Sequence, residues 1–200
     1  MTDVTITLSA PLAAGTYSLT LAAVAPPAPP PPPAATTFWV YQDGEFNWGG
    51  DWSSGALANY SDKAGAPLSG PFDIAMTASN GFGLWTPFAP LNSAGIPAFD
   101  ASPYTHFTVS LKPTRPGQKW SLYLVPGPAG ETFVNGTVVN DISAYGPAPV
   151  VGAWGTYVIP LSVLGVGAGL AVGTDIRKIG LQDQSGSAGN FWYIDNVGFM

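Results

Sequence analysis

KIGLQDQSGSAGNFWYIDNVGFM, residues 178–200, ends the chain and decides its fold. Two apolar runs, 176–183 and 191–199, flank a spacer rich in Gly, Ser and Asn, a pattern typical of a β-hairpin. The second run places Asp195 among large apolar side chains, where an ionised carboxylate is costly unless it is paired, hydrogen-bonded or bound to a cation. We therefore expect Asp195 to have a partner elsewhere in the chain.

A second acidic segment, YQDGE at residues 41–45, closes a similar apolar run at the other end of the domain. If the first and last strands lie side by side, Asp43 or Glu45 meets Asp195, and carboxylates that converge with backbone carbonyls form a Ca²⁺ site. In the other interpretation, Asp43 and Asp195 cap turns or accept hydrogen bonds from backbone N–H groups. The sequence leaves both interpretations open.

The composition favours one β-rich domain with a short appendage. Apolar residues make up 46% of the 200 residues and charged residues only 9%, and 25 Gly and 21 Pro argue against long surface helices. A net charge of −6 gives no footprint for nucleic acid or for insertion into an anionic membrane. The chain has no Cys, no apolar run of membrane-spanning length and no recognisable secretory signal at its start.

The first part of the chain differs from the rest. Residues 1–24 alternate apolar and polar side chains around a PLAAG turn, which predicts a β-hairpin, and an isolated hairpin needs a partner for its apolar face. Residues 25–36 contain seven prolines and predict a stiff linker that holds the hairpin away from the domain. We expect residues 2–23 to dock by strand addition on a larger protein assembly or on copies of themselves, the alternative being a frayed tail.

Residues 37–200 read as all-β. Pro and Gly clusters separate short runs that alternate apolar and polar residues, and such strands suit an antiparallel sandwich. A turn at residues 160–165 is the one helical candidate. The predicted fold is therefore an antiparallel two-sheet jelly-roll sandwich. The expected strands are 38–43, 72–77, 82–85, 106–112, 119–125, 133–139, 154–160, 176–183 and 191–199.

Five segments of this domain, in order VYQDGEFNWGGDW, APLSGPFDIAMT, FDASPYTHFTVSL, WGTYVIPLSVLGV and IGLQDQSGSAGNFWYIDNVGF, resemble a galactose-binding-like jelly roll of the carbohydrate-binding-module type. The resemblance covers residues 37–200 and implies a non-catalytic sugar-binding sandwich. It also implies a structural Ca²⁺ near the junction of the first and last strands, on Asp43, Glu45 and Asp195. Gln42 and Asn196 stand where such modules often carry a further acid.

Sugar recognition needs flat aromatic faces for the C–H side of a pyranose, and amides or carboxylates for its hydroxyls. The segment NWGGDWSSGALANYSD, residues 47–62, reads as a Gly- and Ser-rich loop that supplies both. Trp85 and His106 are further candidates if a sheet face carries the ligand. The predicted ligand-binding residues are Trp48, Trp52, Asp51, Asn47, Asn59, Tyr60 and Trp85.

The seven Trp residues have two expected roles, because large aromatic side chains are usually mostly buried. We expect Trp39, Trp120 and Trp154 in the core. We expect Trp48 or Trp52 to be exposed and available to a ligand.

An enzyme needs an acid, a base or a nucleophile in a recognisable arrangement. With one His, no Cys and twelve scattered acids, neither a Ser-His-Asp arrangement nor a metal-ligand spacing is present. Asp51 and Asp62 are the pair to test for glycoside hydrolysis, but a loop of this kind more often binds than cleaves. We therefore predict a protein that is not an enzyme.

Taken together, these features predict a surface-displayed sugar-binding module that its hairpin anchors to a larger assembly. A protein made without a secretion signal but built for extracellular work suggests a phage virion, as a decoration or tail-attached protein with weak multivalent adhesion to glycans. The expected partners are capsid or tail proteins or further copies of the chain, and the expected location is the virion surface or the extracellular space. The alternatives are a purely structural capsid-decoration protein without a sugar ligand, and a glycan-active enzyme.

Overall fold

The computed structural model describes residues 14–15, 37–51, 56–78, 83–126, 138–170, 172–185 and 191–200. The chain divides into two units, Met1–Pro33 and Ala34–Met200. Apart from Ala14 and Gly15, the expected hairpin and the proline linker lie outside the described residues, so both stay predictions. Across the described ranges, no helix is long and apolar enough to cross a membrane.

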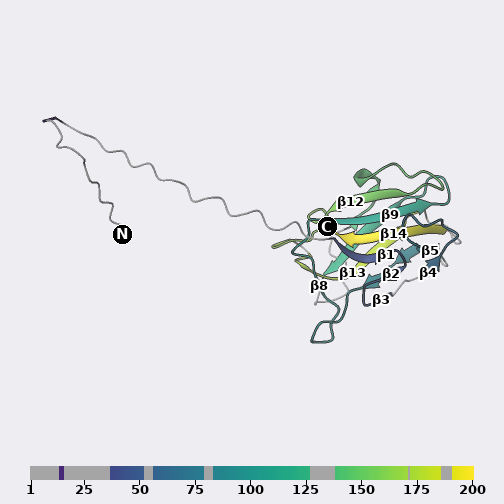
Figure 1. Cartoon of the computed structure of the whole chain (residues 1–200), viewed down its shortest axis with the longest axis horizontal. Coiled ribbons are helices and arrows are strands. Elements are labelled where there is room, and N and C mark those ends of the chain that lie inside the picture. The colour runs from purple at the N-terminus through teal and green to yellow at the C-terminus, as the bar shows by residue number, and fades with distance from the viewer. Residues whose placement is uncertain are drawn as a thin grey trace. The chain divides into compact units, whose positions relative to one another are not determined.

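The second unit is a sandwich of two β-sheets, each with seven strands within the described residues. In sheet A the strands β12, β9, β14, β1 and β2 lie in this order, and β5 joins β14 to β4. Figure 1 shows β12, β9, β14 and β1 side by side. The bounds of the sheet A strands are β1 Phe38–Gln42, β2 Glu45–Phe46, β4 Ala56–Asp62, β5 Asp73–Ala78, β9 His106–Pro113, β12 Gly155–Pro160 and β14 Phe191–Phe199.

Sheet B is centred on β13, which pairs with β10 on one side and with β6, β7 and β8 on the other. The short strand β3 extends the sheet beyond β7, and β11 extends it beyond β10. All of these pairings are antiparallel, as predicted. The bounds are β3 Gly50–Asp51, β6 Gly83–Trp85, β7 Pro87–Phe88, β8 Phe99–Asp100, β10 Trp120–Pro126, β11 Val138–Val139 and β13 Asp175–Asp183.

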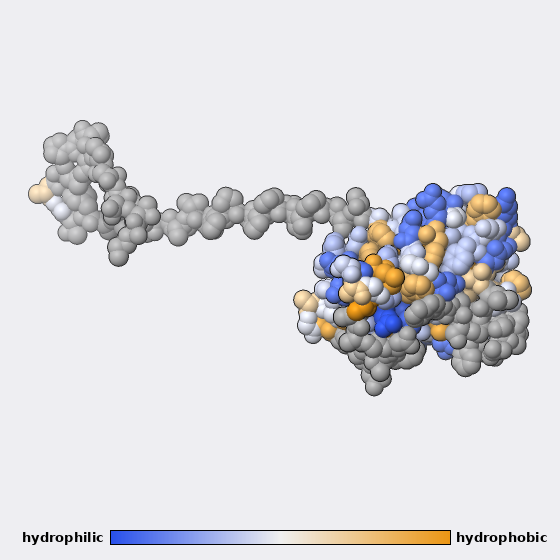
Figure 2. All heavy atoms as spheres, turned by 90° about the horizontal axis from the view of Figure 1, so that it is seen from below, coloured by the Kyte–Doolittle hydropathy of each residue, from blue (hydrophilic) through white to orange (hydrophobic). Residues whose placement is uncertain are grey.

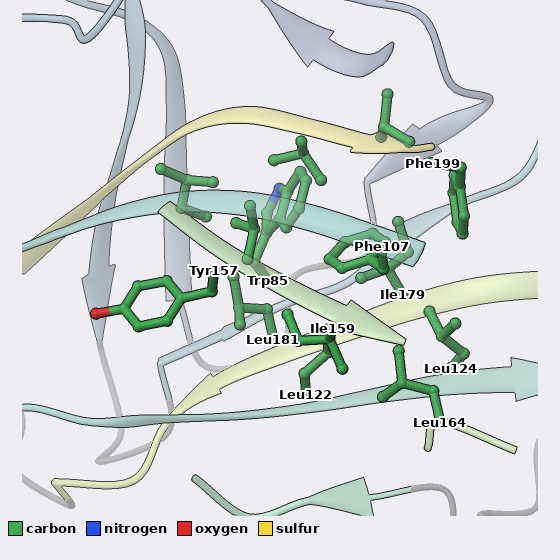
Figure 3. Packing of buried hydrophobic residues seen from close by; sticks show 14 of the residues in the cluster. Trp85, Phe107, Leu122, Leu124, Tyr157, Ile159, Leu164, Ile179, Leu181 and Phe199 are labelled. Atoms are coloured by element: carbon green, nitrogen blue, oxygen red, sulfur yellow. The ribbon is translucent and has the colours of Figure 1, made fainter. Parts of the chain in front are cut away.

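The core fills the space between the two sheets because every long strand turns alternate apolar residues inward. On β9 these are Phe107, Val109 and Leu111, and β10 and β13 meet them from the opposite sheet. Figure 3 shows the resulting layer of interlocking side chains. The buried residues that it labels are Trp85, Phe107, Leu122, Leu124, Tyr157, Ile159, Leu164, Ile179, Leu181 and Phe199.

The structure confirms the all-β jelly-roll sandwich and places the first and last strands side by side, since β1 pairs with β14. The predicted hairpin at the end of the chain is wrong, because β13 belongs to sheet B and β14 to sheet A. A Gly- and Ser-rich spacer serves a crossing between two sheets as readily as a tight turn. The chain therefore changes sheets after Asp183.

The segment 47–62 is also not the single loop that its composition suggests. It contains β3 and the seven-residue strand β4, which pairs with β5. Within β4, Ala58 and Tyr60 pack against the core while Asn59 and Ser61 are exposed, which is the period-two pattern of a half-buried strand. A short 3₁₀ helix, η1 at Ile142–Tyr145, begins at Asp141, whose carboxylate accepts a hydrogen bond from the N–H of Ser143.

Candidate functional site

Asp195 lies at the centre of the junction between the first and last strands. Its carboxylate is fully buried and accepts hydrogen bonds from the N–H groups of Leu68 at 2.9 Å and Ser69 at 3.1 Å, and from that of Asn196 at 2.8 Å. Burial raises the pKa of Asp195 and these three bonds oppose the rise. The partner expected for Asp195 is thus the backbone of the loop between β4 and β5, residues 63–72, named here the β4–β5 loop.

The geometry does not favour a calcium ion held jointly by Asp43, Glu45 and Asp195. Asp43 and Glu45 are exposed at the turn between β1 and β2, where Asp43 has a φ of 57°. Asp43 is near enough to raise the pKa of Asp195, but backbone donors already occupy both oxygens of Asp195. Among the described residues, no three His, Cys, Asp or Glu side chains are grouped so that they could hold a metal ion.

Two of the predicted sugar-binding rings lie in the core. Trp48 is only 7% exposed, with its ring edge-on to Phe99 and Phe199, and Trp85 is fully buried. A ring enclosed in this way has no free face for a sugar, so of the two rings of which one was expected to be exposed, only Trp52 stays a candidate. Trp52 lies outside the described residues.

The structure does bring three of the predicted residues together. The indole N–H of Trp85 donates a hydrogen bond to the Tyr60 hydroxyl at 2.8 Å, and Asp51 is close enough to raise the pKa of Tyr60 further, after burial. These three side chains link β4 of sheet A to β3 and β6 of sheet B inside the sandwich, which is a structural role. Asn47 and Asn59 are exposed, and the side chain of Asn59 accepts a hydrogen bond from the N–H of Ser61.

Of the three Trp residues expected in the core, only Trp120 is buried there. Trp39 and Trp154 are half-buried, so their predicted burial is wrong. Trp154 instead packs on the outer side of sheet A, where its indole N–H donates to the carbonyl of Ala66 at 2.9 Å. The ammonium of Lys112 lies 5.7 Å from the centre of the Trp154 ring.

The β4–β5 loop covers part of the outer face of sheet A. Asp195 holds its Leu68 and Ser69 N–H groups, and the Nζ of Lys112 donates to its Gly65 carbonyl at 2.5 Å. Trp154 binds the next carbonyl of the loop. Strands β14 and β9 and Trp154, the residue before β12, therefore anchor the loop over this part of the face, whereas Thr156 and Val158 of β12 are exposed.

The outer face of sheet B carries a different set of side chains, named here the sheet B strip. Tyr123 faces Gly180 across the β10–β13 pair, and its ring lies where a Cβ on Gly180 would stand, 1.9 Å from Cζ. In the same way, the Phe88 ring lies over Gly50 of β3. The full strip consists of Ser121, Tyr123, Lys178, Gly180, Gln182, Phe88 and Gly50.

The strip combines flat rings with hydrogen-bonding groups. Lys178 stands opposite Phe88, and Gln182 stands opposite Ser121, whose hydroxyl also accepts a hydrogen bond from the Gln184 amide at 2.6 Å. Tyr123 is 6% exposed, and its burial raises its pKa to about 12, so its hydroxyl stays protonated at neutral pH. Phe88 and Gln182 are half-buried, whereas Ser121 and Lys178 are buried.

This strip was not among the predicted binding residues, although the sequence carries a signal for it. In the predicted strands 119–125 and 176–183, the inward residues are Trp120, Leu122, Leu124, Ile179 and Leu181. Alternation therefore places Tyr123 and Gln182 on the opposite face. The pairing of each ring with a glycine depends on strand register, which alternation alone does not provide.

Comparison with known structures shows which proteins share this architecture. A family 30 carbohydrate-binding module of a cellulosomal cellulase from Clostridium thermocellum is 14% identical, with a TM-score of 0.54 over 83% of this chain and 98% of that chain. Residues 34–200 form a jelly roll of the carbohydrate-binding-module type. No family model and no curated protein matches the sequence.

Two further similar structures are variants of a family 29 carbohydrate-binding module in complex with sugars. The complex with cellulohexaose has a TM-score of 0.51 at 15% identity, over 82% of this chain and 89% of that chain. The complex with mannohexaose has a TM-score of 0.50 at 15% identity, over 82% of this chain and 90% of that chain. At this identity the comparison establishes the jelly-roll fold, and the function needs an argument of its own.

Proposed function

We propose that residues 34–200 form a non-catalytic module that binds a glycan on the sheet B strip. The observation that carries the proposal is the partly exposed Phe88 ring, which lies flat over Gly50 of β3, beside the more deeply buried Tyr123 ring over Gly180. A ring held flat against a sheet offers its face to the C–H side of a pyranose, and adjacent amide and ammonium groups bind hydroxyls. Gln182 and Lys178 occupy those adjacent positions.

We place the glycan on sheet B because a loop of the protein's own chain lies on sheet A. Part of the outer face of sheet A is covered by the β4–β5 loop, which Asp195, Lys112 and Trp154 hold in place. A ligand on that part of the face would have to displace these hydrogen bonds. On the sheet B strip, Phe88 and Gln182 are partly exposed and can be contacted directly.

The ligand that fits is neutral. A net charge of −6 disfavours acidic polysaccharides, and the exposed apolar side chains are too scattered to favour an apolar partner. On the face seen in Figure 2, apolar residues form small separate groups among polar ones. The neutral hexaoses bound by the family 29 modules are therefore the first ligands to test.

Isothermal titration calorimetry of the full chain with cellulohexaose and mannohexaose, preceded by a glycan array, tests the proposal. Phe88→Ala should weaken binding about tenfold, because one ring–sugar contact contributes about 1.5 kcal/mol at most beyond its buried area. Phe191→Ala is the matched control, since Phe191 is 45% exposed on sheet A. The proposal is refuted if no glycan binds, or if both Ala variants lose affinity equally.

The structure offers no separate support for catalysis. The two acids considered for hydrolysis serve different neighbours: Asp51 is adjacent to Tyr60, and Asp62 accepts a hydrogen bond from the N–H of Gly65 at 2.8 Å and faces Asp73 in the strand register. The similar folds are also those of binding modules. A non-catalytic function is therefore part of the proposal, and incubating the purified protein with the same hexaoses should release no shorter products.

The display of this module on a larger assembly, such as a phage particle, is a further proposal that rests on residues 2–23 and the proline-rich linker. It is supported by the division of the chain into two units, Met1–Pro33 and Ala34–Met200. Sedimentation of the full chain beside residues 34–200 tests it, because an assembly hairpin predicts oligomers only for the full chain. Oligomers together with an empty glycan array would favour the purely structural alternative.

A further inference from the structure

A third aromatic ring lies over a glycine, this time on the outer face of sheet A. Trp39 of β1 pairs with Gly198 of β14, and a Cβ on Gly198 would stand 2.9 Å from the Cε3 atom of the Trp39 ring. The neighbours of Gly198, Val197 and Phe199, are fully buried in the core. Alternation therefore places the ring on the outer side of the strand, where Trp39 is only half-buried.

Hydroxyl and aliphatic side chains continue this surface across the sheet. The register leads from Gly198 to Thr108 of β9, and from Thr108 to Val158 of β12. In the next row, the Ser110 and Thr156 hydroxyls share a hydrogen bond of 2.8 Å. Val158 is 40% exposed and Thr156 is exposed, so a ligand can reach this side of the Trp39 ring.

An amide lies on the other side of the ring. Asn47 is exposed, and its N–H donates to the carbonyl of Val40, the residue after Trp39, at 2.9 Å. None of the side chains around the ring is charged. We name this surface the sheet A patch, and it consists of Trp39, Asn47, Thr108, Thr156, Val158 and Gly198.

The β4–β5 loop leaves this part of sheet A open. Asp195, which holds the loop, stands opposite Ser110 in the register, and Lys112 lies two residues further along β9. The centre of the patch is Thr108, two residues from Ser110 in the other direction. A ligand on the patch therefore does not have to displace the hydrogen bonds of the loop.

We propose that the sheet A patch is a second binding site for a neutral glycan, so that the module has one sugar site on each outer face. The indole face suits the C–H side of a pyranose, and the amide and hydroxyl groups around it suit sugar hydroxyls. A charged ligand would need a countercharge that the patch does not have, and an apolar partner would need more apolar surface than Trp39 and Val158 provide. The choice of a neutral glycan rests on the proposed function, whereas the location of the patch does not.

The two sites lie on opposite sides of the sandwich, whose sheets are stacked about 10 Å apart. One short sugar chain cannot contact both, so each hexaose occupies a single site and two bind per protein chain. On a polysaccharide, one module would then bridge two glycan strands.

The test is an NMR titration of the ¹⁵N-labelled full chain with cellulohexaose or mannohexaose, in which backbone amide signals locate each site. The amides of Thr108, Val158 and Gly198 should shift as one set, and those of Gly180 and Gln182 as another. Trp39→Ala should remove the shifts of the first set and leave the Kd of the second within twofold. Phe88→Ala should do the reverse.

Two further variants make the result independent of any effect of Trp39→Ala on folding. Val158→Arg places a long charged side chain at an exposed position of β12 without touching the core, and it should weaken binding at the patch at least fivefold. Phe191→Ala removes a ring that is 45% exposed at the far end of β14, and both sets of shifts should persist.

The outcomes separate the second site from the proposed function. If only Gly180 and Gln182 shift, the second site is overturned and the proposed function stands. If only the patch shifts, the second site stands and the placement of the glycan on sheet B fails, and if nothing shifts, both fail. The second site is also overturned if its shifts survive in Trp39→Ala and Val158→Arg, or if Trp39→Ala moves signals of residues 2–23 without glycan, since the chain's own first segment would then cover the patch.

Discussion

The stability of this protein without divalent cations should fall as the pH rises from about 4 to about 7, and Asp73 should be the main cause. In the unfolded chain Asp73 loses its proton near its usual pKa of 3.8, whereas in the folded protein burial and Asp62 raise the pKa to about 7. Between these values the folded state binds more protons, so each increase in pH favours unfolding. The contribution of Asp73 is fully present below pH 3.8 and is lost above pH 7.

The size of the effect follows from the same two pKa values. Each pH unit in the window costs at most about 1.4 kcal/mol, which gives an upper limit of about 4 kcal/mol between pH 3.8 and 7. Urea unfolding of the wild-type chain and Asp73→Asn, in EGTA at half-unit steps of pH, measures it. The amide has nearly the same shape but does not titrate, so the difference between the two proteins isolates Asp73 from other acids such as Asp195.

The two stability curves should converge as the pH falls. At pH 8 the Asp73→Asn variant should be more stable than the wild-type chain, because the amide removes a buried, repelled charge and its NH₂ donates to Asp62. Near pH 4 this advantage should disappear, because Asp73 is then protonated and donates in the same way. Curves that stay parallel from pH 4 to pH 8 would show that the Asp62–Asp73 pair does not titrate as argued.

Three further substitutions test the rest of the fold. Gly180→Ala should cost about 1–3 kcal/mol by urea unfolding and weaken sugar binding, because its methyl group would stand 1.9 Å from the Tyr123 ring; an unchanged affinity would separate Tyr123 from the site. Trp85→Phe should cost about 2–4 kcal/mol, because it leaves a cavity and removes the donor to the Tyr60 hydroxyl, and a loss below 1 kcal/mol would contradict this. Asn196 has a φ of 46°, and its side chain accepts a hydrogen bond from the Ser69 hydroxyl. Thermal unfolding should therefore give the highest Tm with Asn at this position, a lower one with Gly and the lowest with Ala. Ala both loses the hydrogen bond and keeps about 1 kcal/mol of backbone strain.

Much of the sandwich could be predicted because its long strands carry a clear period of two. The run at 106–112 became β9 with Phe107, Val109 and Leu111 inward, and 191–199 matches β14. The predicted hairpin between 176–183 and 191–199 is wrong because a Gly- and Ser-rich spacer between apolar runs does not determine which sheet the second run joins. That choice depends on β1, β5 and β9, which pair with β14 from distant parts of the sequence.

The candidate sites were less predictable because they depend on register. Trp48 follows the two-residue strand β2 in a Gly-rich segment, which suggested an exposed ring, yet packing against Phe99 and Phe199 encloses it. The sequence did not predict that Asp62 and Asp73 lie opposite each other, because residues 47–62 read as a loop and not as a strand. The sequence predicts that a buried carboxylate near the junction of the first and last strands destabilises the fold unless it has a partner. Three backbone N–H groups bind Asp195, so the destabilising carboxylate is Asp73.

The β4–β5 loop and the sheet B strip separate stability from recognition. The β4–β5 loop lies on the outer side of sheet A, where Lys112 and Trp154 hold it. The sheet B strip lies on the other side of a core that contains Trp85, so its rings do not depend on that loop for their position. A change at one site alters affinity at another only if it favours one of two arrangements there. Asp73→Asn should therefore change stability while leaving the Kd for the glycan on this strip unchanged, and a changed Kd would mean that the loop and the strip share a movable element.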